Sequence, residues 1–344
     1  MRVLLATDAW FPQVNGVVRT LARVRDELAA AGITVAVIAP DGFRSVPCPT
    51  YPEIRLALLP GRGIAQRIDA FAPDAIHIAT EGPIGHATRA LCLRRGLAFT
   101  TSFHTRFPEY VKARFGVPAA LGYGVLRRFH GPAQAVMVAT ASLRRELGER
   151  GFDNVVAWSR GVDTGLFRPQ RGGLEDLPRP VFAYVGRVAV EKNIAAFLAL
   201  DLPGTKVVIG DGPQRAALQR RYPATRFLGT LHGQELAAAF ADADVFVFPS
   251  RTDTFGLVLL EALACGVPVA AYPETGPIDV VNDPRVAVLD EDLGRAALAA
   301  LALSRETCRE FALGHGWSHT ARQFASNLAL LSDVAIPVIA AQQA

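Results

Sequence analysis

The sequence predicts an α/β protein with two doubly wound parallel-sheet domains that face each other across a cleft. The chain has 344 residues, half of them apolar, which is enough for two domains that each bury a core. Short apolar runs alternate with stretches of helical spacing, a pattern typical of parallel sheets covered by helices on both faces. The alternation stops at the Pro-, Gly- and charge-rich residues 168–180 and then starts again.

The first half of the chain opens with a strand over residues 2–7. Residues 17–31 then have apolar side chains at helical spacing and end before Gly32. Further strands are expected at 33–39, 54–58, 75–79, 99–103 and 135–139. We therefore assign residues 1–167 to an N-terminal domain.

The second half repeats the pattern after the expected linker, 168–180. Strands are expected at 181–185, 206–209, 245–248, 267–271 and 286–289, and an amphipathic helix at 317–331. We assign residues 181–316 to a C-terminal domain and 317–344 to a C-terminal helix. Sheets of this kind bind ligands beyond the carboxyl ends of their strands, so functional residues are expected in the loops that follow them.

Charge and cysteine content narrow the possible partners and compartments. The net charge is +4, with residues 1–167 net basic and 168–344 net acidic. A basic half suits an anionic membrane surface or a solvated arginine-rich face, and no basic run with interleaved aromatic residues favours nucleic acid. The four cysteines are scattered, as expected of thiols in a reducing compartment. With no signal-peptide pattern and no uncharged stretch of about 20 residues, we expect a cytoplasmic protein.

The most informative stretch is Pro249–Pro268, which reads PSRTDTFGLVLLEALACGVP. It lies between two apolar runs that indicate buried parallel strands, so its middle should be a crossover helix. Asp253 precedes this helix and Glu261 lies on it, about 10 Å away at ~1.5 Å per residue. The helix N-terminus between them offers unpaired N–H groups, which favours an anion such as a sugar-linked phosphate.

Three further loops carry suitable residues. Arg187 and Lys192 follow a buried strand in GRVAVEKN, and two cations at a strand end could clamp a diphosphate. A chance pair of surface cations, with Glu191 as the partner of either, is the alternative. Gly210 lies in GDGP after a strand, and Gly16 opens the first helix. Each glycine could let the backbone approach a ligand or simply form a tight turn.

His104 ends a predicted strand and would point into the cleft, although a lone histidine is more often a satisfied core residue. The chain has no GxGxxG, P-loop, GxSxG or HExxH motif. Asp242 and Asp244 lie at the wrong end of a strand for a metal–diphosphate site, and His315 and His319 lack a third ligand. We therefore expect no metal site.

Together these motifs resemble the retaining glycosyltransferases of family 4, which have the GT-B fold of two Rossmann-like domains. The resemblance covers nearly the whole chain and rests on VGRVAVEKN, GDGP and PSRTDTFGLVLLEALACGVP, the last of which is similar to the family's E-x7-E segment. The first acid here is Asp253 in place of the commoner Glu, one methylene shorter. The resemblance implies an N-terminal acceptor domain, a C-terminal nucleotide-sugar donor domain and a final segment that returns to the N-terminal domain.

The resemblance also implies roles for individual residues. Arg187 and Lys192 would hold the donor diphosphate and stabilise the leaving group. Asp253 would bind hydroxyls of the donor sugar, and Glu261 those of the ribose. The other expected donor-site positions are Gly16, His104, Gly210, Leu231, His232, Thr254, Phe255 and Gly256. Transfer would retain the anomeric configuration, without a cofactor and without a required metal.

The acceptor side is expected within residues 103–130, which mix aromatic and basic residues in the basic half. This composition is typical of a segment that inserts rings among lipid headgroups, although a helical hairpin that buries its aromatic residues would show it too. The acceptor and membrane candidates are Phe107, Tyr110, Lys112, Arg114, Arg127 and Arg128. The motifs DAWFPQVNGVVRT and TDTFG most resemble those of bacterial enzymes that glycosylate lipids, so we expect peripheral attachment to the inner face of the cell membrane.

The leading hypothesis is transfer of glucose or glucuronic acid from a UDP-sugar to a membrane lipid such as diacylglycerol. A GDP-mannose-dependent α-mannosyltransferase is the alternative within the family. Two alternatives of another class are a sugar-nucleotide epimerase, which needs no acceptor, and a non-catalytic two-domain binding protein.

Overall fold

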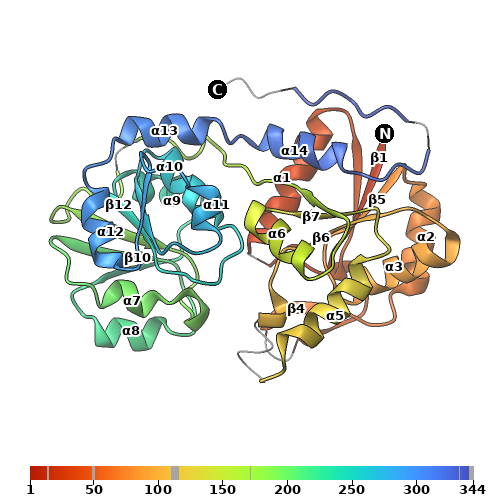
Figure 1. Ribbon diagram of the computed structural model, residues 1–344, viewed down its shortest axis with the longest axis horizontal. Helices are drawn as coiled ribbons and strands as arrows, with labels where there is room; N and C mark the ends of the chain where they lie inside the picture. The colour runs from red at the N-terminus through yellow and green to blue at the C-terminus, as the bar shows by residue number, and fades with distance from the viewer. Residues whose placement is uncertain (14, 49–50, 110–115, 171, 333, 341–344) are drawn as a thin grey trace. The chain divides into compact units, whose positions relative to one another are not determined.

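A computed structural model describes residues 1–340 except 14, 49–50, 110–115, 171 and 333. The chain forms two compact units (Figure 1). Unit 1 comprises Met1–Ser159 and the described residues from Trp317 on, and unit 2 comprises Arg160–Gly316. This division precedes the expected linker, 168–180, because Val162 and Phe167 already belong to the core of unit 2.

Unit 1 is built on a six-stranded parallel sheet with the order β2-β1-β5-β6-β7-β8. The strands are β1 (Arg2–Ala6), β2 (Thr34–Ile38), β5 (Ala75–Ile78), β6 (Thr100–Ser102), β7 (Ala135–Val138) and β8 (Val155–Ala157). The register runs from Arg2↔Thr34 between β1 and β2 to Val138↔Ala157 between β7 and β8. All strands run in one direction, so their carboxyl ends share one edge of the sheet.

Helices cover both faces of this sheet. On one face α1 (Gly16–Ala30) packs against α14 (Trp317–Ser326), and Leu21, Val24 and Phe324 share a core with Val3 and Leu5. The other face is covered by α2 (Gly61–Phe71), α3 (Pro83–Arg95), α5 (Ala119–His130) and α6 (Ala141–Glu149). Helix α14 is thus part of the core of unit 1, and it ends at Ser326, earlier than the sequence predicts, because Leu330 pairs with Ala75 in a β-bridge.

Unit 2 has a second six-stranded parallel sheet with the order β11-β10-β9-β12-β13-β14. The strands are β9 (Val181–Val185), β10 (Thr205–Ile209), β11 (Arg226–Gly229), β12 (Val245–Phe248), β13 (Val269–Ala271) and β14 (Ala287–Leu289). The helices α7 (Ile194–Leu198), α8 (Arg215–Arg221) and α12 (Leu293–Ala300) pack on one face. On the other face lie α9 (Gly233–Ala241), α10 (Leu257–Ala264) and α13 (Arg305–Leu313), and Figure 1 shows α7 and α8 on the opposite side of the sheet from α9 and α10.

The structure confirms the doubly wound α/β architecture and differs in particular strands. The apolar run 54–58 belongs to an antiparallel hairpin of β3 (Ser45–Cys48) and β4 (Tyr51–Ala57), not to the parallel sheet. The sequence does not predict the edge strands β8 and β11, since β8 is only three residues long and β11 is partly exposed and has only two consecutive apolar residues, Phe227 and Leu228.

Candidate functional site

The candidate residues of unit 2 gather where the strand order of its sheet reverses. β9 and β12 are neighbours, yet the chain continues from β9 to β10 on one side and from β12 to β13 on the other. Open α/β sheets bind ligands at this switch point, outside the carboxyl ends of the strands. The loop after β9 carries Arg187 and Lys192, and the loop after β12 carries Asp253.

Side chains tie these two loops together. Lys192 forms an ion pair with Asp253, and the Thr252 hydroxyl donates to the Glu191 carbonyl at 3.0 Å. Glu191 was an alternative partner for Lys192 in the sequence, but the ammonium group pairs with Asp253, 61 residues further along the chain. The loop after β9 and the loop after β12 are therefore joined by an ion pair and a hydrogen bond.

Asp253 has capacity to accept another hydrogen bond. Its Oδ1 receives the Lys192 ammonium, whereas its Oδ2 is buried and has no hydrogen-bond partner among the described residues. The side chains of Lys192 and Asp253 are only 26% and 17% exposed. Leaving a buried polar atom unsatisfied costs about 1–3 kcal/mol, so this site favours a ligand that brings a hydroxyl group to Oδ2.

A buried tyrosine holds the backbone at Arg187. Tyr184 is 2% exposed, and its hydroxyl donates to the Arg187 carbonyl at 2.8 Å. Burial, together with the negative charges of Asp253 and Glu191, raises the pKa of Tyr184, so it stays a neutral donor. The sequence does not point to Tyr184, because a tyrosine in a buried strand does not reveal which loop its hydroxyl reaches.

Glycines allow the loops after β9 and β10 to pack backbone against backbone. The Gly186 N–H donates to the Ile209 carbonyl at 2.9 Å, and the Val188 N–H to the Asp211 carbonyl at 2.8 Å. Gly210 has a φ of +140°, and a Cβ there would lie 1.9 Å from the Gly186 carbonyl oxygen. This close approach is sufficient reason for a glycine at 210, and its contact with a ligand stays a prediction.

Helix α10 begins at the centre of the site. Gly256, with a φ of +81°, forms its N-cap, and Thr254 and Phe255 before it are half-buried. The first N–H groups of an α-helix have no helical partner and suit an anion. Glu261 lies further along α10 and is 3% exposed. Buried carboxylates are uncommon, so Glu261 is a candidate ligand-binding group.

Arg251 joins three neighbouring loops and was not singled out in the sequence. Its guanidinium donates to Glu274 at 2.6 Å and to Glu291 at 2.7 Å, and it lies 3.7 Å from the centre of the Tyr272 ring. The two carboxylates raise the pKa of Arg251. These partners follow β13 and β14, so Arg251 holds the loop that carries Asp253 two residues later. Partners 23 and 40 residues away leave no signal in the sequence.

Leu231 and His232 form the turn between β11 and α9. Leu231 packs partly against the core of unit 2, and His232 is exposed directly before α9. The turn follows the edge strand, two strands away from β9. A contact between this turn and a nucleotide base stays a prediction.

Gly16 and His104 belong to unit 1. Gly16 is the exposed first residue of α1, where the Asn15 side chain caps the helix by accepting from the N–H groups of Val17 and Val18 at 3.0 Å each. His104 follows β6, is half-buried and packs edge-on against the Trp158 ring, with 5.7 Å between the ring centres. Their roles toward a donor stay predictions.

The acceptor and membrane candidates lie on the α5 side of unit 1. Phe107 is 48% exposed, and Arg127 and Arg128 are exposed in the last turn of α5. Tyr110, Lys112 and Arg114 lie outside the described residues. An apolar cavity of about 230 Å³ is lined by Phe107, Pro108, Val117, Pro118, Gly122, Val125 and Leu126.

The paired aspartates at the start of β12 serve the backbone of unit 2. One Asp242 oxygen accepts from the N–H groups of Gly173 at 2.5 Å and Leu174 at 2.8 Å, and Asp244 accepts from the Val181 N–H at 2.6 Å. Within the part of the chain that the structure describes, His, Cys, Asp and Glu side chains form no group of three or more that could hold a metal ion. No helix in that part has the length and apolarity to span a bilayer.

Comparisons with known proteins agree with this arrangement. Residues 14–166 match the family model described as Glycosyltransferase Family 4, and residues 179–305 match the model described as Glycosyl transferases group 1. A GDP-mannose-dependent alpha-mannosyltransferase of Mycolicibacterium smegmatis is 32% identical, over 87% of this chain and 87% of its own. The protein of the same name from Mycobacterium tuberculosis is 30% identical, over 84% of this chain and 83% of its own. An alpha-monoglucosyldiacylglycerol synthase of Streptococcus pneumoniae is 26% identical, over 88% of this chain and 78% of its own.

Solved structures share the fold. Sucrose-phosphate synthase from Thermosynechococcus elongatus superposes with a TM-score of 0.77 at 20% identity, over 94% of this chain and 97% of that one. An Anabaena protein solved in complex with UDP-glucose superposes with a TM-score of 0.70 at 15% identity, over 95% and 98%. At these identities the likeness shows the pair of six-stranded α/β sheets and nothing finer.

Proposed function

Because this chain belongs to glycosyltransferase family 4 and is a glycosyltransferase of the GT-B fold, we propose that it transfers mannose from GDP-mannose to a membrane lipid with retention at the anomeric carbon. Two relatives that are 32% and 30% identical and are covered over more than 80% of their own length are GDP-mannose-dependent alpha-mannosyltransferases. A sulfoquinovosyl transferase of Arabidopsis thaliana is 32% identical over 70% of this chain but over only 51% of its own, and the diacylglycerol glucosyltransferase is 26% identical. The comparisons thus favour the mannosyl alternative over UDP-glucose or UDP-glucuronic acid, which we keep as the second donor hypothesis.

The observation that carries the proposal is the pairing of Lys192 with Asp253 at the switch point of unit 2. The ammonium group would meet the donor diphosphate and stabilise negative charge as the leaving group departs, together with the exposed Arg187 from the same loop. Asp253 Oδ2, which can still accept a hydrogen bond, could accept one from a hydroxyl of the sugar. Glu261 on α10 would accept hydrogen bonds from the ribose hydroxyls, and the first turn of α10 would take a phosphate.

The proposed reaction needs no group outside the donor and acceptor. The bond between the anomeric carbon and the diphosphate oxygen breaks, and the acceptor hydroxyl oxygen bonds to the same face of the sugar. The acceptor proton passes to the leaving phosphate, and the cations of the loop after β9 balance its charge. We propose that neither a cofactor nor a metal is required.

A donor screen tests the function. The purified chain is offered GDP-mannose, UDP-glucose, UDP-glucuronic acid or UDP-galactose with diacylglycerol vesicles, with and without EDTA. We expect GDP-mannose to have a kcat/KM at least about tenfold above the others, a discrimination of about 1.4 kcal/mol, and EDTA to leave it unchanged. A higher kcat/KM with a UDP-sugar would replace the donor assignment. A changed sugar nucleotide formed from donor alone would indicate an epimerase.

We also infer that unit 1 meets the lipid surface near α5. Phe107, Leu121 and Val125 are 48%, 65% and 63% exposed, and Arg127 and Arg128 follow on the same helix. Exposed apolar side chains beside basic ones suit an anionic bilayer, where each basic residue contributes about 1 kcal/mol. The protein would then act as a peripheral enzyme on the inner face of the cell membrane.

Replacing both Arg127 and Arg128 with alanine should weaken binding to anionic vesicles by about thirtyfold, since two surface contacts of ~1 kcal/mol are lost. Vesicle co-sedimentation at low and high salt measures the binding of the variant and of the wild-type protein. The matched control is Arg220→Ala with Arg221→Ala, an adjacent pair in the last turn of α8. Equal binding of the wild-type protein to neutral and anionic vesicles would contradict the inference.

A further inference from the structure

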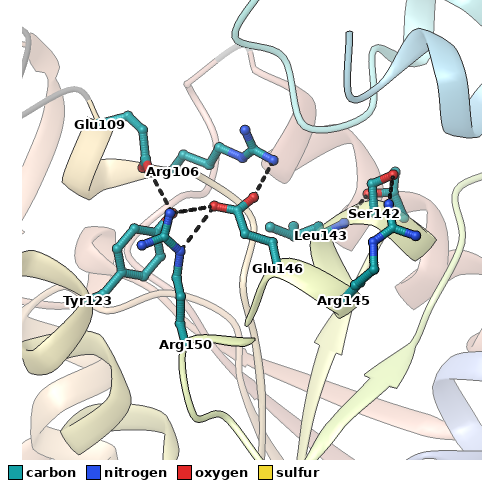
Figure 2. A network of polar contacts seen from close by, with 9 residues as sticks. Arg106, Glu109, Tyr123, Ser142, Leu143, Arg145, Glu146 and Arg150 are labelled. Carbon is teal, nitrogen blue, oxygen red and sulfur yellow. Dashed lines mark hydrogen bonds and ion pairs between the residues drawn. The ribbon is translucent and has the colours of Figure 1, made fainter. Parts of the chain in front are cut away.

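The segment that follows β6 is held by a network of charged side chains (Figure 2). The Arg106 guanidinium donates to Glu146 Oε2 at 2.6 Å, and the Tyr123 hydroxyl donates to Glu109 Oε1 at 2.7 Å. Arg150 donates to the other Glu146 oxygen at 3.0 Å. Glu146 therefore binds two arginines, one from the segment and one from the end of its own helix, α6.

This network is partly shielded from water. The side chains of Arg106 and Glu146 are 16% and 23% exposed, and Tyr123 is 4% exposed. The Arg150 guanidinium lies 3.9 Å from the centre of the Tyr123 ring, a cation–π contact that fixes the ring. Charge-assisted hydrogen bonds in such surroundings are strong and directional. The network therefore holds its members in one geometry.

The segment itself, residues 104–109, has mainly local backbone contacts in the described structure. The Phe107 N–H donates to the Thr105 carbonyl at 2.9 Å, and the Glu109 N–H to the Arg106 carbonyl at 3.1 Å. Side chains connect it to the rest of unit 1: Arg106 reaches α6 and Glu109 reaches Tyr123 on α5. His104, two residues before Arg106, packs on the Trp158 ring.

Trp158 provides a fixed surface for the imidazole. It is fully buried, and its indole N–H donates to the Thr320 carbonyl of α14 at 3.2 Å. His104 is thus restrained on one side by this ring and along the chain by the Arg106–Glu146 pair. A shift of Arg106 would turn the backbone that carries the imidazole.

We propose that Glu146 is a positioning residue for transfer: by holding Arg106 it sets the orientation of the His104 imidazole. This role rests on the proposed function and on the expectation from the sequence that His104 is a donor-site residue. It extends the site to a carboxylate on α6 that no sequence motif marks. In this role Glu146 contacts no substrate and acts on the imidazole through Arg106.

The test compares Glu146→Gln with Glu149→Gln in the whole protein. Glu149 is the exposed last residue of the same helix, so its replacement controls for the loss of one carboxylate from α6. The first readout is the imidazole carbon–proton NMR signal of His104, assigned by its loss in His104→Ala. We expect it to move in Glu146→Gln and stay in place in Glu149→Gln.

The second readout is a double-mutant cycle on kcat. Glu146→Gln should lower kcat about tenfold with the donor KM within about twofold, as expected of a misplaced group. In the His104→Ala background it should have no further effect, because both changes act through one group. The proposal would be overturned by an unmoved His104 signal. It would also be overturned if the reductions in kcat caused by Glu146→Gln and His104→Ala multiplied in the double variant.

Two outcomes keep the positioning role and the proposed function separable. If the wild-type protein turns over no donor, the proposed function fails, while the His104 signal still decides whether Glu146 orients the imidazole. If Glu146→Gln does not fold, Arg106→Lys replaces it, since it keeps the positive charge and loses the planar guanidinium. Arg106→Lys should then move the His104 signal in the same direction, and an unmoved signal counts against the proposal.

Discussion

Lys192→Ala is expected to lower kcat/KM for the nucleotide sugar by about 10²–10³-fold, the range found when one preorganised donor to a developing charge is removed. The ammonium group is the described partner of Asp253 Oδ1, and Oδ2 already lacks one among the described residues. Without Lys192 the leaving phosphate loses a cation and a partly buried carboxylate loses its counter-charge. Steady-state kinetics with the preferred donor measure the change.

The control for this variant is Arg295→Ala, which breaks an exposed ion pair with Asp290 in the same unit. Exposed pairs contribute about 0–1 kcal/mol, so the kcat/KM of this control should stay within about twofold of wild type. Retention of wild-type kcat/KM by Lys192→Ala would show that the loops after β9 and β12 are not the donor site.

Gly210→Ala is expected to destabilise unit 2 by about 3 kcal/mol or more and to abolish binding of GDP. The new Cβ would lie 1.9 Å from the Gly186 carbonyl oxygen, and the φ of +140° is strained for any side chain. Strained φ/ψ and a backbone clash each cost on the order of 1–3 kcal/mol. Relief of the clash must separate the loops after β9 and β10, and the former carries Arg187 and Lys192. Urea unfolding and calorimetry with GDP measure both effects.

Gly233→Ala is the matched control for stability. Gly233 also has a positive φ, +51°, at a strand-to-helix turn of unit 2, but nothing lies within 4 Å of the place where its Cβ would be. It should cost only about 1–2 kcal/mol, the strain of a left-handed conformation. Equal unfolding midpoints for the two variants would mean that the contact between Gly210 and Gly186 does not constrain the loop.

The sequence predicts the frame of the site well, because buried parallel strands leave continuous apolar runs and functional loops follow them. The runs 181–185 and 245–248 were identified as strands β9 and β12, which places Arg187, Lys192 and Asp253 at strand ends. The sequence does not predict how these residues pair. The sequence offers the neighbouring Glu191 as a partner for Lys192, and only the sheet order brings Asp253 to it.

The sequence does not reveal the role of side chains whose partners lie far along the chain. In the sequence, Tyr184 has only the pattern of a buried strand residue. Arg251 has that of an exposed cation, and Glu146 that of a polar position on a helix. Their contacts join different helices, strands and loops, whereas hydrophobic periodicity identifies each element by itself. Arg106 and Glu146, for example, are 40 residues apart. The edge strand β11 was missed for a different reason, since exposed strands need no apolar run.

The return of α14 to unit 1 has a consequence for synthesis on the ribosome. The described residues of unit 2 form one continuous stretch, whereas the core of unit 1 needs Phe324 and Ala325 to cover the face formed by Leu21 and Leu28. At about 5–20 residues per second, the ribosome adds the intervening chain in roughly 10–30 s. During that time the nascent first sheet carries an uncovered apolar face while the second unit can finish folding. The N-terminal half of this protein therefore depends on its last helix, and chaperones have a defined surface to protect until that helix emerges.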